Sequence, residues 1–211
     1  MFEQYEKKVY SQQGEDGIIE HIFNVIGTTN NVAAEIGMSV NFPECNTYNL
    51  ATLGWKTFWF DMQPINTSII PPTSFFVKHK ITADNVANIF DMVSVPIEMD
   101  LLSIDIDSND YYIREALHMY KPRVCVQEYN GCFDGTEEYI MPRNDNHQLV
   151  HNTIFGASLK SIEIQADRQG YDLVYCDQRG VNAFFIRKDV NPFGHVPSEK
   201  AWKRLFWYGY R

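Results

Sequence analysis

A chain of 211 residues, 45% hydrophobic and 21% charged, has the length and composition of one folded α/β domain, which excludes an intrinsically disordered chain. The formal net charge of -9 at pH 7 disfavours an extended nucleic-acid backbone as a partner, because the two would repel each other. The N-terminus has no signal-peptide core, no apolar run approaches the ~20 residues of a membrane-spanning helix, and the cysteines form no CxxC pair. We therefore expect a cytoplasmic protein with reduced thiols, no membrane span and no nucleic-acid partner.

Strand and helix patterns alternate through the first half of the chain. After a polar turn, "SQQGEDG" at 11–17, and a helix, the sequence predicts two further helices, at 44–54 and 82–93. Thr82 is expected to cap the second of these, with Asp84 in its first turn. Short runs rich in apolar and aromatic residues predict three strands: 31–37, 56–63 and 74–81.

The alternation continues in the second half and then ends in a hairpin. The next predicted elements are a strand, a helix, a strand and, after a polar loop, a further helix: 100–105, 109–120, 123–129 and 156–170. Only "QRGV" joins the last two predicted strands, 171–177 and 182–189. A link this short makes a hairpin, so the final strand must run antiparallel to its neighbour.

This order of elements predicts the fold class. Strand–helix alternation implies a parallel sheet with helices on both faces. With the hairpin added, we expect an α/β fold whose seven-stranded sheet is mostly parallel and ends in antiparallel C-terminal strands. Residues 1–211 are expected to form one domain, with a tail at 190–211 that is a packing or homodimer segment rather than a membrane anchor.

Acidic residues stand at the ends of most predicted strands. In open α/β sheets, ligands bind beyond the carboxyl ends of the strands, so these acids lie where a ligand is expected. Capping of the helix at 109–120 would explain Asp105, Asp107 or Asp110, but it explains Glu35 and Asp61 poorly.

The loop after the first predicted strand argues against a dinucleotide. It reads "EIGMSVNFPECN", with one glycine where the dinucleotide motif needs three. An acid ahead of a single glycine, with a second acid at the end of the next strand, suits a cationic nucleoside that carries an amino acid. Such a ligand is S-adenosylmethionine, whose ribose hydroxyls would donate to Asp61.

Six motifs spread along the chain are distinctive: "YSQQGEDGIIEHIF" (10–23), "ECNT" (44–47), "LLSIDIDSNDYY" (101–112), "QEYN" (127–130), "FGASLKSI" (155–162) and "GVNAFFIR" (180–187). With them, the chain from Tyr10 to about Asp189 resembles the FkbM-type class I methyltransferases. The resemblance implies a Rossmann-like seven-stranded sheet and an S-adenosylmethionine cofactor. Such proteins usually have a second glycine near Val40–Asn41, which this chain lacks.

The resemblance also implies a set of cofactor-binding residues. An N-terminal segment, 1–30, would fold over the cofactor, Glu35 and Gly37 would face its methionine part, and Asp61 its ribose. Thr82 or Asp84 would lie near the adenine. The residues of the covering segment, together with an acid from the fourth strand end, complete the set: Gln12, Gly14, Glu15, Asp16 and Asp105.

"DID" at 105–107 and "QEYN" at 127–130 are similar to metal-dependent sugar O-methyltransferases of the TylF/MycE kind. By that similarity, Asp105 and Glu128 are candidate ligands of Mg²⁺ or Mn²⁺, and Asp107 is the candidate base that takes the proton of a hydroxyl. Tyr129 stands where those enzymes have a second acid, so Asn130 or Asp134 would supply the third ligand. A hydrogen-bonding network of carboxylates is the alternative for this cluster.

Two histidines of the polar loop are further candidates. His147 and His151 are spaced i, i+4, as in half of a zinc site, although the chain has no HExxH glutamate. A role in substrate binding or acid–base catalysis fits their position after the fifth predicted strand, and ordinary surface histidines are the remaining alternative.

Three functions compete at this stage. The first is an O-methyltransferase acting on a sugar hydroxyl of a small-molecule or glycan acceptor, and a deoxyhexose such as rhamnose fits it. The aromatic content of 14% favours a carbohydrate. The second is a glycosyltransferase that uses Asp105 and Asp107 as a DxD motif for a metal and a nucleotide-sugar. The third is a non-catalytic binding module with the same fold.

Overall fold

The computed structural model describes residues 2–38, 44–147 and 155–206. Its strands are β1 Val32–Ile36, β2 Lys56–Asp61, β3 Ser74–Lys78, β4 Leu101–Ile104, β5 Val124–Glu128, β6 Tyr171–Cys176 and β7 Asn182–Arg187. Its α-helices are α1 Glu15–Ile26, α2 Tyr48–Thr52, α3 Val86–Met92, α4 Asp110–Ala116, α5 Leu159–Arg168 and α6 Ser198–Ala201.

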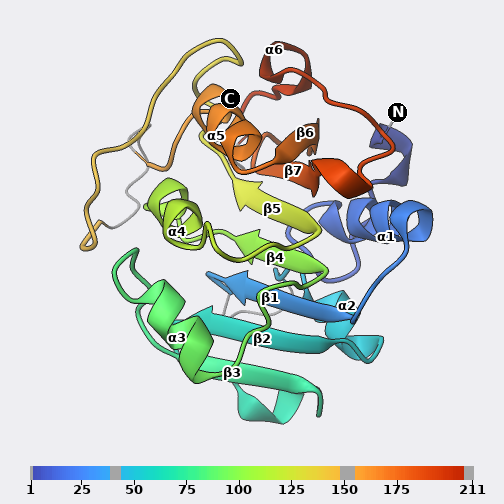
Figure 1. Ribbon diagram of the computed structural model, residues 1–211, viewed down its shortest axis with the longest axis vertical. Helices are drawn as coiled ribbons and strands as arrows, with labels where there is room; N and C mark the ends of the chain where they lie inside the picture. Colours follow the sequence, from blue (N-terminus) through green and yellow to red (C-terminus); the bar gives the residue numbers. More distant parts are fainter. Residues whose placement is uncertain (1, 39–43, 148–154, 207–211) are drawn as a thin grey trace.

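The seven strands form one sheet in the order β3-β2-β1-β4-β5-β7-β6 (Figure 1). Strands β1 to β5 pair in parallel, whereas β7 pairs antiparallel with both β5 and β6. The predicted Rossmann-like α/β fold, mostly parallel with an antiparallel C-terminal hairpin, is confirmed. After β3 the chain returns to the middle of the sheet and adds β4 on the other side of β1, so the strand order reverses there. The neighbours β1 and β4 therefore mark the switch point where such sheets bind ligands.

Helices cover both faces of the sheet. The apolar sides of α3, α4 and α5 pack on one face together with inward residues of β1, β4 and β5. Helix α1 buries Ile18, Ile19 and Ile22 against the other face, on alternate residues of the same strands such as Ala33 and Leu101. The central strands are therefore buried on both faces, as the unbroken apolar runs of a parallel sheet require.

Three predicted helices begin later than their sequence patterns suggested. The helix predicted at 156–170 begins at Leu159, after its N-cap Ser158. The helix predicted at 44–54 begins at Tyr48, because residues 44–47 form a loop whose amides bind elsewhere. The helix predicted at 82–93 begins at Val86. Thr82 is not its cap, since the Thr82 hydroxyl makes no capping bond and the Thr82 amide instead donates to the Asn85 side chain.

The C-terminal tail packs on its own domain over the part that the structure describes. After α6, the amide of Leu205 donates to Gly131 and that of Phe206 donates to Arg179, which places the tail beside the β6–β7 turn and the end of β5. Within the described residues, no helix combines the length and the apolar character needed to cross a membrane.

Candidate active site

A cavity of about 480 Å³ opens at the carboxyl ends of the parallel strands. Its wall includes the ends of β1, β2, β4 and β5, the position predicted for a ligand from the acids at the strand ends. Lys80 is the single lysine in the described wall. Against it stand seven acidic residues: Glu35, Glu44, Asp61, Asp105, Asp107, Glu128 and Asp145.

The three aspartates that follow β4 have two different environments. Asp110, the first residue of α4, accepts hydrogen bonds from the amides of Ile106 (2.8 Å) and Ser108 (3.0 Å). It therefore holds the turn that precedes α4, and it is not an N-cap, because the N-cap residue is Asn109 and α4 has no side-chain capping bond. Asp105 and Asp107 both line the cavity, and Asp107 has a positive φ of 57°. A left-handed conformation of a residue other than glycine is uncommon and is often kept at a functional site.

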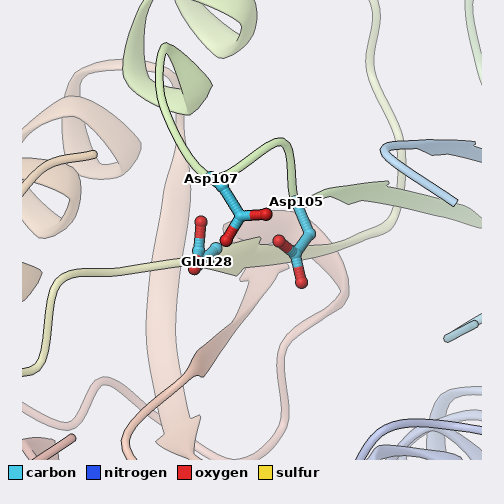
Figure 2. Close-up of side chains that lie close together, drawn as sticks. All are labelled: Asp105, Asp107 and Glu128. Carbon is cyan, nitrogen blue, oxygen red and sulfur yellow. The ribbon is translucent and has the colours of Figure 1, made fainter. Parts of the chain in front are cut away.

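Asp105, Asp107 and Glu128 converge from β4 and β5 (Figure 2). Each offers one carboxylate oxygen, and these oxygens all lie within 4.8 Å of one another. Burial raises the pKa of Asp105 and of Glu128 well above the ordinary carboxyl value, and the mutual repulsion of the acids raises both further. Such a cluster is stable only when it holds protons or a cation.

Glu128 has an oxygen with nothing to bind. The residue is 6% exposed, and its Oε2 is buried without a hydrogen-bond partner in the described ranges of the chain. A bare buried carboxylate oxygen, two further carboxylates and an all-oxygen donor set fit Mg²⁺ or Mn²⁺ better than zinc.

His147 reaches this cluster from the polar loop. It lines the cavity, and its Nε2 is buried without a hydrogen-bond partner among the residues that the structure describes. Burial raises the pKa of Asp107, and the proximity of His147 opposes that shift. Arg143 holds the loop through ion pairs with Asp84 (2.6 Å) and Asp145 (2.9 Å).

Glu35 organises the first loop rather than standing free in the cavity. Its carboxylate accepts from the amides of Asn46 (2.8 Å) and Thr47 (2.9 Å) and from the thiol of Cys45 (2.8 Å). This capture of the loop explains the late start of α2. Next to it, Gly37 has a φ of 89°, and a Cβ there would lie 1.5 Å from the carbonyl oxygen of Asp105, so only glycine fits between β1 and β4.

Asp61 ends β2 and lines the cavity, as predicted for a residue that binds a ribose. Its Oδ1 accepts from the amide of Gln63 (2.6 Å), and burial raises the pKa of Asp61. Thr82 and Asp84, predicted near an adenine, do not line the cavity. Asp84 is instead an exposed partner of Arg143.

The N-terminal segment meets the cavity through Gln12 and Gln13, while the acids behind them act as its supports. Asp16 accepts from three consecutive amides, those of residues 9–11, at 2.7–2.8 Å. Glu15 accepts from the Gln13 amide (2.7 Å) and from the Asn182 side chain (3.0 Å). Of the four residues predicted to cover the cofactor, only Gln12 lines the cavity; Gly14, Glu15 and Asp16 do not.

The two candidates for a third metal ligand do not reach the acidic cluster. Asn130 donates from Nδ2 to the Phe155 carbonyl and accepts from the Cys132 amide, and Asp134 binds Thr136 at the surface. His151 lies outside the described residues, so the zinc half-site stays a prediction. The loop around Val40–Asn41, where the sequence lacks a second glycine, also lies outside them.

Sequence reasoning missed several residues of the wall. Asn46 stood in the quoted "ECNT" motif and Asn182 in "GVNAFFIR", and those motifs were the available signal. Leu205 and Phe206 belong to the tail, and nothing in the sequence pattern indicated that the tail returns to the sheet.

No protein-family profile and no curated protein matches the sequence. Among solved structures, the chain is similar to the MycE methyltransferase from the mycinamycin biosynthetic pathway in complex with Mg and SAH, with 14% identity and a TM-score of 0.49 over 84% of this chain. A structure of that enzyme with Mg, SAH and mycinamycin VI matches at 14% identity and a TM-score of 0.48, also over 84% of this chain. The chain spans about half the length of these structures, 50% in both. A likeness this remote carries no residue role, substrate or metal across to this chain.

Proposed function

We propose that this chain is an S-adenosylmethionine-dependent O-methyltransferase that methylates a sugar hydroxyl, with a deoxyhexose of a glycan or glycoside as the acceptor. The observation that carries the proposal is the cavity at the carboxyl edge of the sheet, where seven acidic residues face a single lysine in the described wall. A wall of this charge attracts a sulfonium and a divalent cation, and it repels the diphosphate of a nucleotide-sugar.

The cofactor would lie over the ends of β1 and β2. Asp61 offers a carboxylate oxygen to ribose hydroxyls, and Gly37, whose lack of a Cβ lets it pack against the Asp105 carbonyl, lines the cavity between β1 and β4. Glu35 holds the loop that carries Asn46, and Gln12 closes the cavity from the N-terminal segment. When bound, S-adenosylmethionine would supply a methyl group on a positively charged sulfur.

Asp105 and Glu128 would hold the divalent cation, with Asp107 beside them. The fit rests on the bare Oε2 of Glu128 and on the three carboxylate oxygens within 4.8 Å. Burial and, after it, mutual repulsion raise the pKa of Asp105 and of Glu128, and a positive charge among these carboxylates would relieve both effects. A bound Mg²⁺ or Mn²⁺ would lower the pKa of a coordinated hydroxyl.

Asp107 would act as the base. An alcohol holds its proton too tightly to be a good nucleophile, so a positioned carboxylate must take that proton as the oxygen bonds to the methyl carbon. The raised pKa of Asp107 makes it a stronger base than an ordinary aspartate. His147, whose Nε2 is unpaired in the same wall, is placed to orient the acceptor or to pass the proton on to solvent.

The acceptor would enter on the side of β7 and the tail. Leu205 and Phe206 give that side an apolar surface, next to the polar Asn182 and Glu128. Apolar and aromatic faces beside hydrogen-bonding groups suit a deoxy sugar, which has one face poor in hydroxyls.

The proposal is tested by transfer of a labelled methyl group from S-adenosylmethionine to a panel of methyl glycosides, with and without EDTA. We expect turnover that needs Mg²⁺ or Mn²⁺, and we expect Glu128→Ala to lose this metal stimulation while it keeps its affinity for S-adenosylhomocysteine, because a cation held by few carboxylates depends on each. Glu44→Ala, which removes another acid of the wall, is the matched control and should stay metal-dependent. Turnover that EDTA leaves unchanged would remove the metal from the proposal, and Asp105 and Glu128 would then have positioning roles.

A further inference from the structure

Asn182 is a buried polar residue that lies beside the acidic cluster. It is the first residue of β7, is 1% exposed, and lines the cavity. In the antiparallel ladder it pairs directly with Glu128, so the two side chains stand on the same face of the sheet as neighbours.

A hydrogen bond to Glu15 fixes the orientation of the Asn182 side-chain amide. Its Nδ2 donates to Oε1 of Glu15 at 3.0 Å. The other oxygen of Glu15 is engaged by the Gln13 amide at 2.7 Å, and the backbone amide of Asn182 is engaged by Asp177. With Nδ2 committed to Glu15, the side chain presents its oxygen, Oδ1, on the other side.

Within the described part of the chain, Oδ1 of Asn182 is buried and has no hydrogen-bond partner, and the same holds for Oε2 of its neighbour Glu128. Two adjacent buried acceptors without a donor are rare in native structures. A neighbouring donor or a cation that both oxygens share would satisfy them together.

We infer that Oδ1 of Asn182 is a neutral oxygen ligand of the divalent cation that Asp105 and Glu128 hold, and that Glu15 is the positioning residue that turns this oxygen toward the cation. The inference rests on the proposed function, which places a cation at the cluster. Hard cations accept amide oxygens alongside carboxylates. A neutral ligand also adds an oxygen without adding a further negative charge to acids that already repel one another.

Binding of Mn²⁺ alone tests the inference without cofactor or acceptor. It is measured by the loss of the free-ion signal in electron paramagnetic resonance. Asn182→Ala should bind Mn²⁺ about tenfold more weakly than the wild type, the lower end of the usual effect of altering a metal site's supporting groups. Glu15→Gln should weaken binding similarly. The Gln13 amide keeps the oxygen of the new side chain, so its nitrogen faces Asn182 and turns Oδ1 away from the cation.

The double variant Glu15→Gln with Asn182→Asp tests the same inference if Asn182→Ala fails to fold. In this variant the new amide nitrogen at position 15 donates to one oxygen of the new carboxylate at position 182, which leaves the other oxygen for the cation. The total charge is conserved, so Mn²⁺ affinity should return to at least the wild-type level. A double variant that binds as weakly as Glu15→Gln would overturn the inference.

Asn46→Ala is the matched control, because Asn46 is also a buried asparagine of the wall but its Nδ2 donates to the Ser103 hydroxyl instead. It should bind Mn²⁺ as the wild type does. Equal losses for Asn46→Ala and Asn182→Ala, or no loss for Asn182→Ala, would overturn the inference while leaving the metal of the proposed function in place. A wild-type protein that binds no Mn²⁺ would instead refute that metal, and the inference with it.

Discussion

Strand β4 has an aspartate at each end, and the protein treats the two in opposite ways. Asp100, just before the strand, is fully buried and accepts from the amides of residues 29–31 and from the Thr29 hydroxyl. It also forms an ion pair with Arg123 at 3.0 Å. These donors hold the pKa of Asp100 below its ordinary value even though burial opposes them.

Asp105, just after the strand, has acids for neighbours instead. Burial raises its pKa, and Asp107 and Asp110 raise it further. One end of β4 is therefore arranged for stability, and the other carries an electrostatic cost that the fold itself does not relieve. A cost of this kind, concentrated at the carboxyl edge beside a cavity, is what a binding site for a cation and a cationic cofactor would require.

The largest expected effect concerns Asp107. Asp107→Asn should reduce turnover by ~10²–10⁴, the usual contribution of general-base catalysis, because an amide cannot take the hydroxyl proton. The affinity for S-adenosylhomocysteine and the melting temperature should hardly change, since Asp110 holds the turn and asparagine tolerates the positive φ of this position. Turnover and calorimetry on the same variant measure all three quantities.

The pH dependence of this variant sharpens the assignment. A base works only when deprotonated, so wild-type turnover should fall as the pH drops through the raised pKa of Asp107. The deficit of Asp107→Asn should be greatest near neutral pH and shrink as hydroxide replaces the missing base. Loss of cofactor affinity together with turnover would place Asp107 in the cofactor site instead.

The second prediction compares the same substitution at the two ends of β4. Asp100→Asn should lower the free energy of unfolding by about 3–5 kcal/mol, because it leaves the buried Arg123 and several amides without their charged acceptor. Asp105→Asn should leave stability unchanged or raise it in metal-free buffer, since it removes a repelled carboxylate. Urea denaturation of both variants provides the measurement. Equal destabilisation of the two variants would show that Asp100 and Asp105 do not differ in their contribution to stability.

The third prediction concerns the ribose. Asp61→Ala should weaken S-adenosylmethionine binding by one to two orders of magnitude, about 1.5–3 kcal/mol, as expected when a charged acceptor of hydroxyl hydrogen bonds is removed. Asp84→Ala is the matched control near the same edge, and its affinity should be unchanged because Asp84 lies outside the cavity wall and pairs with Arg143. Wild-type affinity in the Asp61 variant would show that the ribose lies elsewhere.

The smallest expected effect is on thermal stability. Burial raises the pKa of Asp110 to about 6 and that of Asp177 to about 7, and it raises the pKa of Asp105 and Glu128 as well. These groups bind more protons folded than unfolded, so stability should fall as the pH rises from 5 to 8. In EDTA the melting temperature should drop by at least about 2–4 °C, the equivalent of ~1 kcal/mol for a domain of this size.

Mn²⁺ should reduce this drop, because it replaces the lost protons as the counter-charge of Asp105 and Glu128. Scanning calorimetry at the two pH values, with EDTA and with Mn²⁺, measures the difference. A melting temperature that rises with pH in EDTA would mean that groups with lowered pKa values, such as Asp100, dominate instead.

The sheet was predictable from sequence because each strand is a local pattern. The apolar runs and the short "QRGV" link determined the strands, their direction and the antiparallel hairpin. Helix starts were less predictable, because the loop at 44–47 is captured by Glu35, a residue of another element. A capture of this kind depends on tertiary contacts that no local propensity records.

The candidate site divides in the same way. Asp61, Asp105, Asp107 and Glu128 were predictable because strand ends meet at one edge of a parallel sheet. Asn182 was not, because it reaches Glu128 only through the pairing of β5 with β7, whose distance along the chain leaves no periodic signal.

Calorimetric titration of the wild-type protein with S-adenosylmethionine, and separately with a nucleotide-sugar in Mn²⁺, tests the central claim most directly. We expect one binding site for S-adenosylmethionine and no heat of binding for the nucleotide-sugar, whose diphosphate the acidic wall repels. Metal-dependent binding of the nucleotide-sugar without binding of S-adenosylmethionine would refute the proposed methyltransferase and favour the glycosyltransferase.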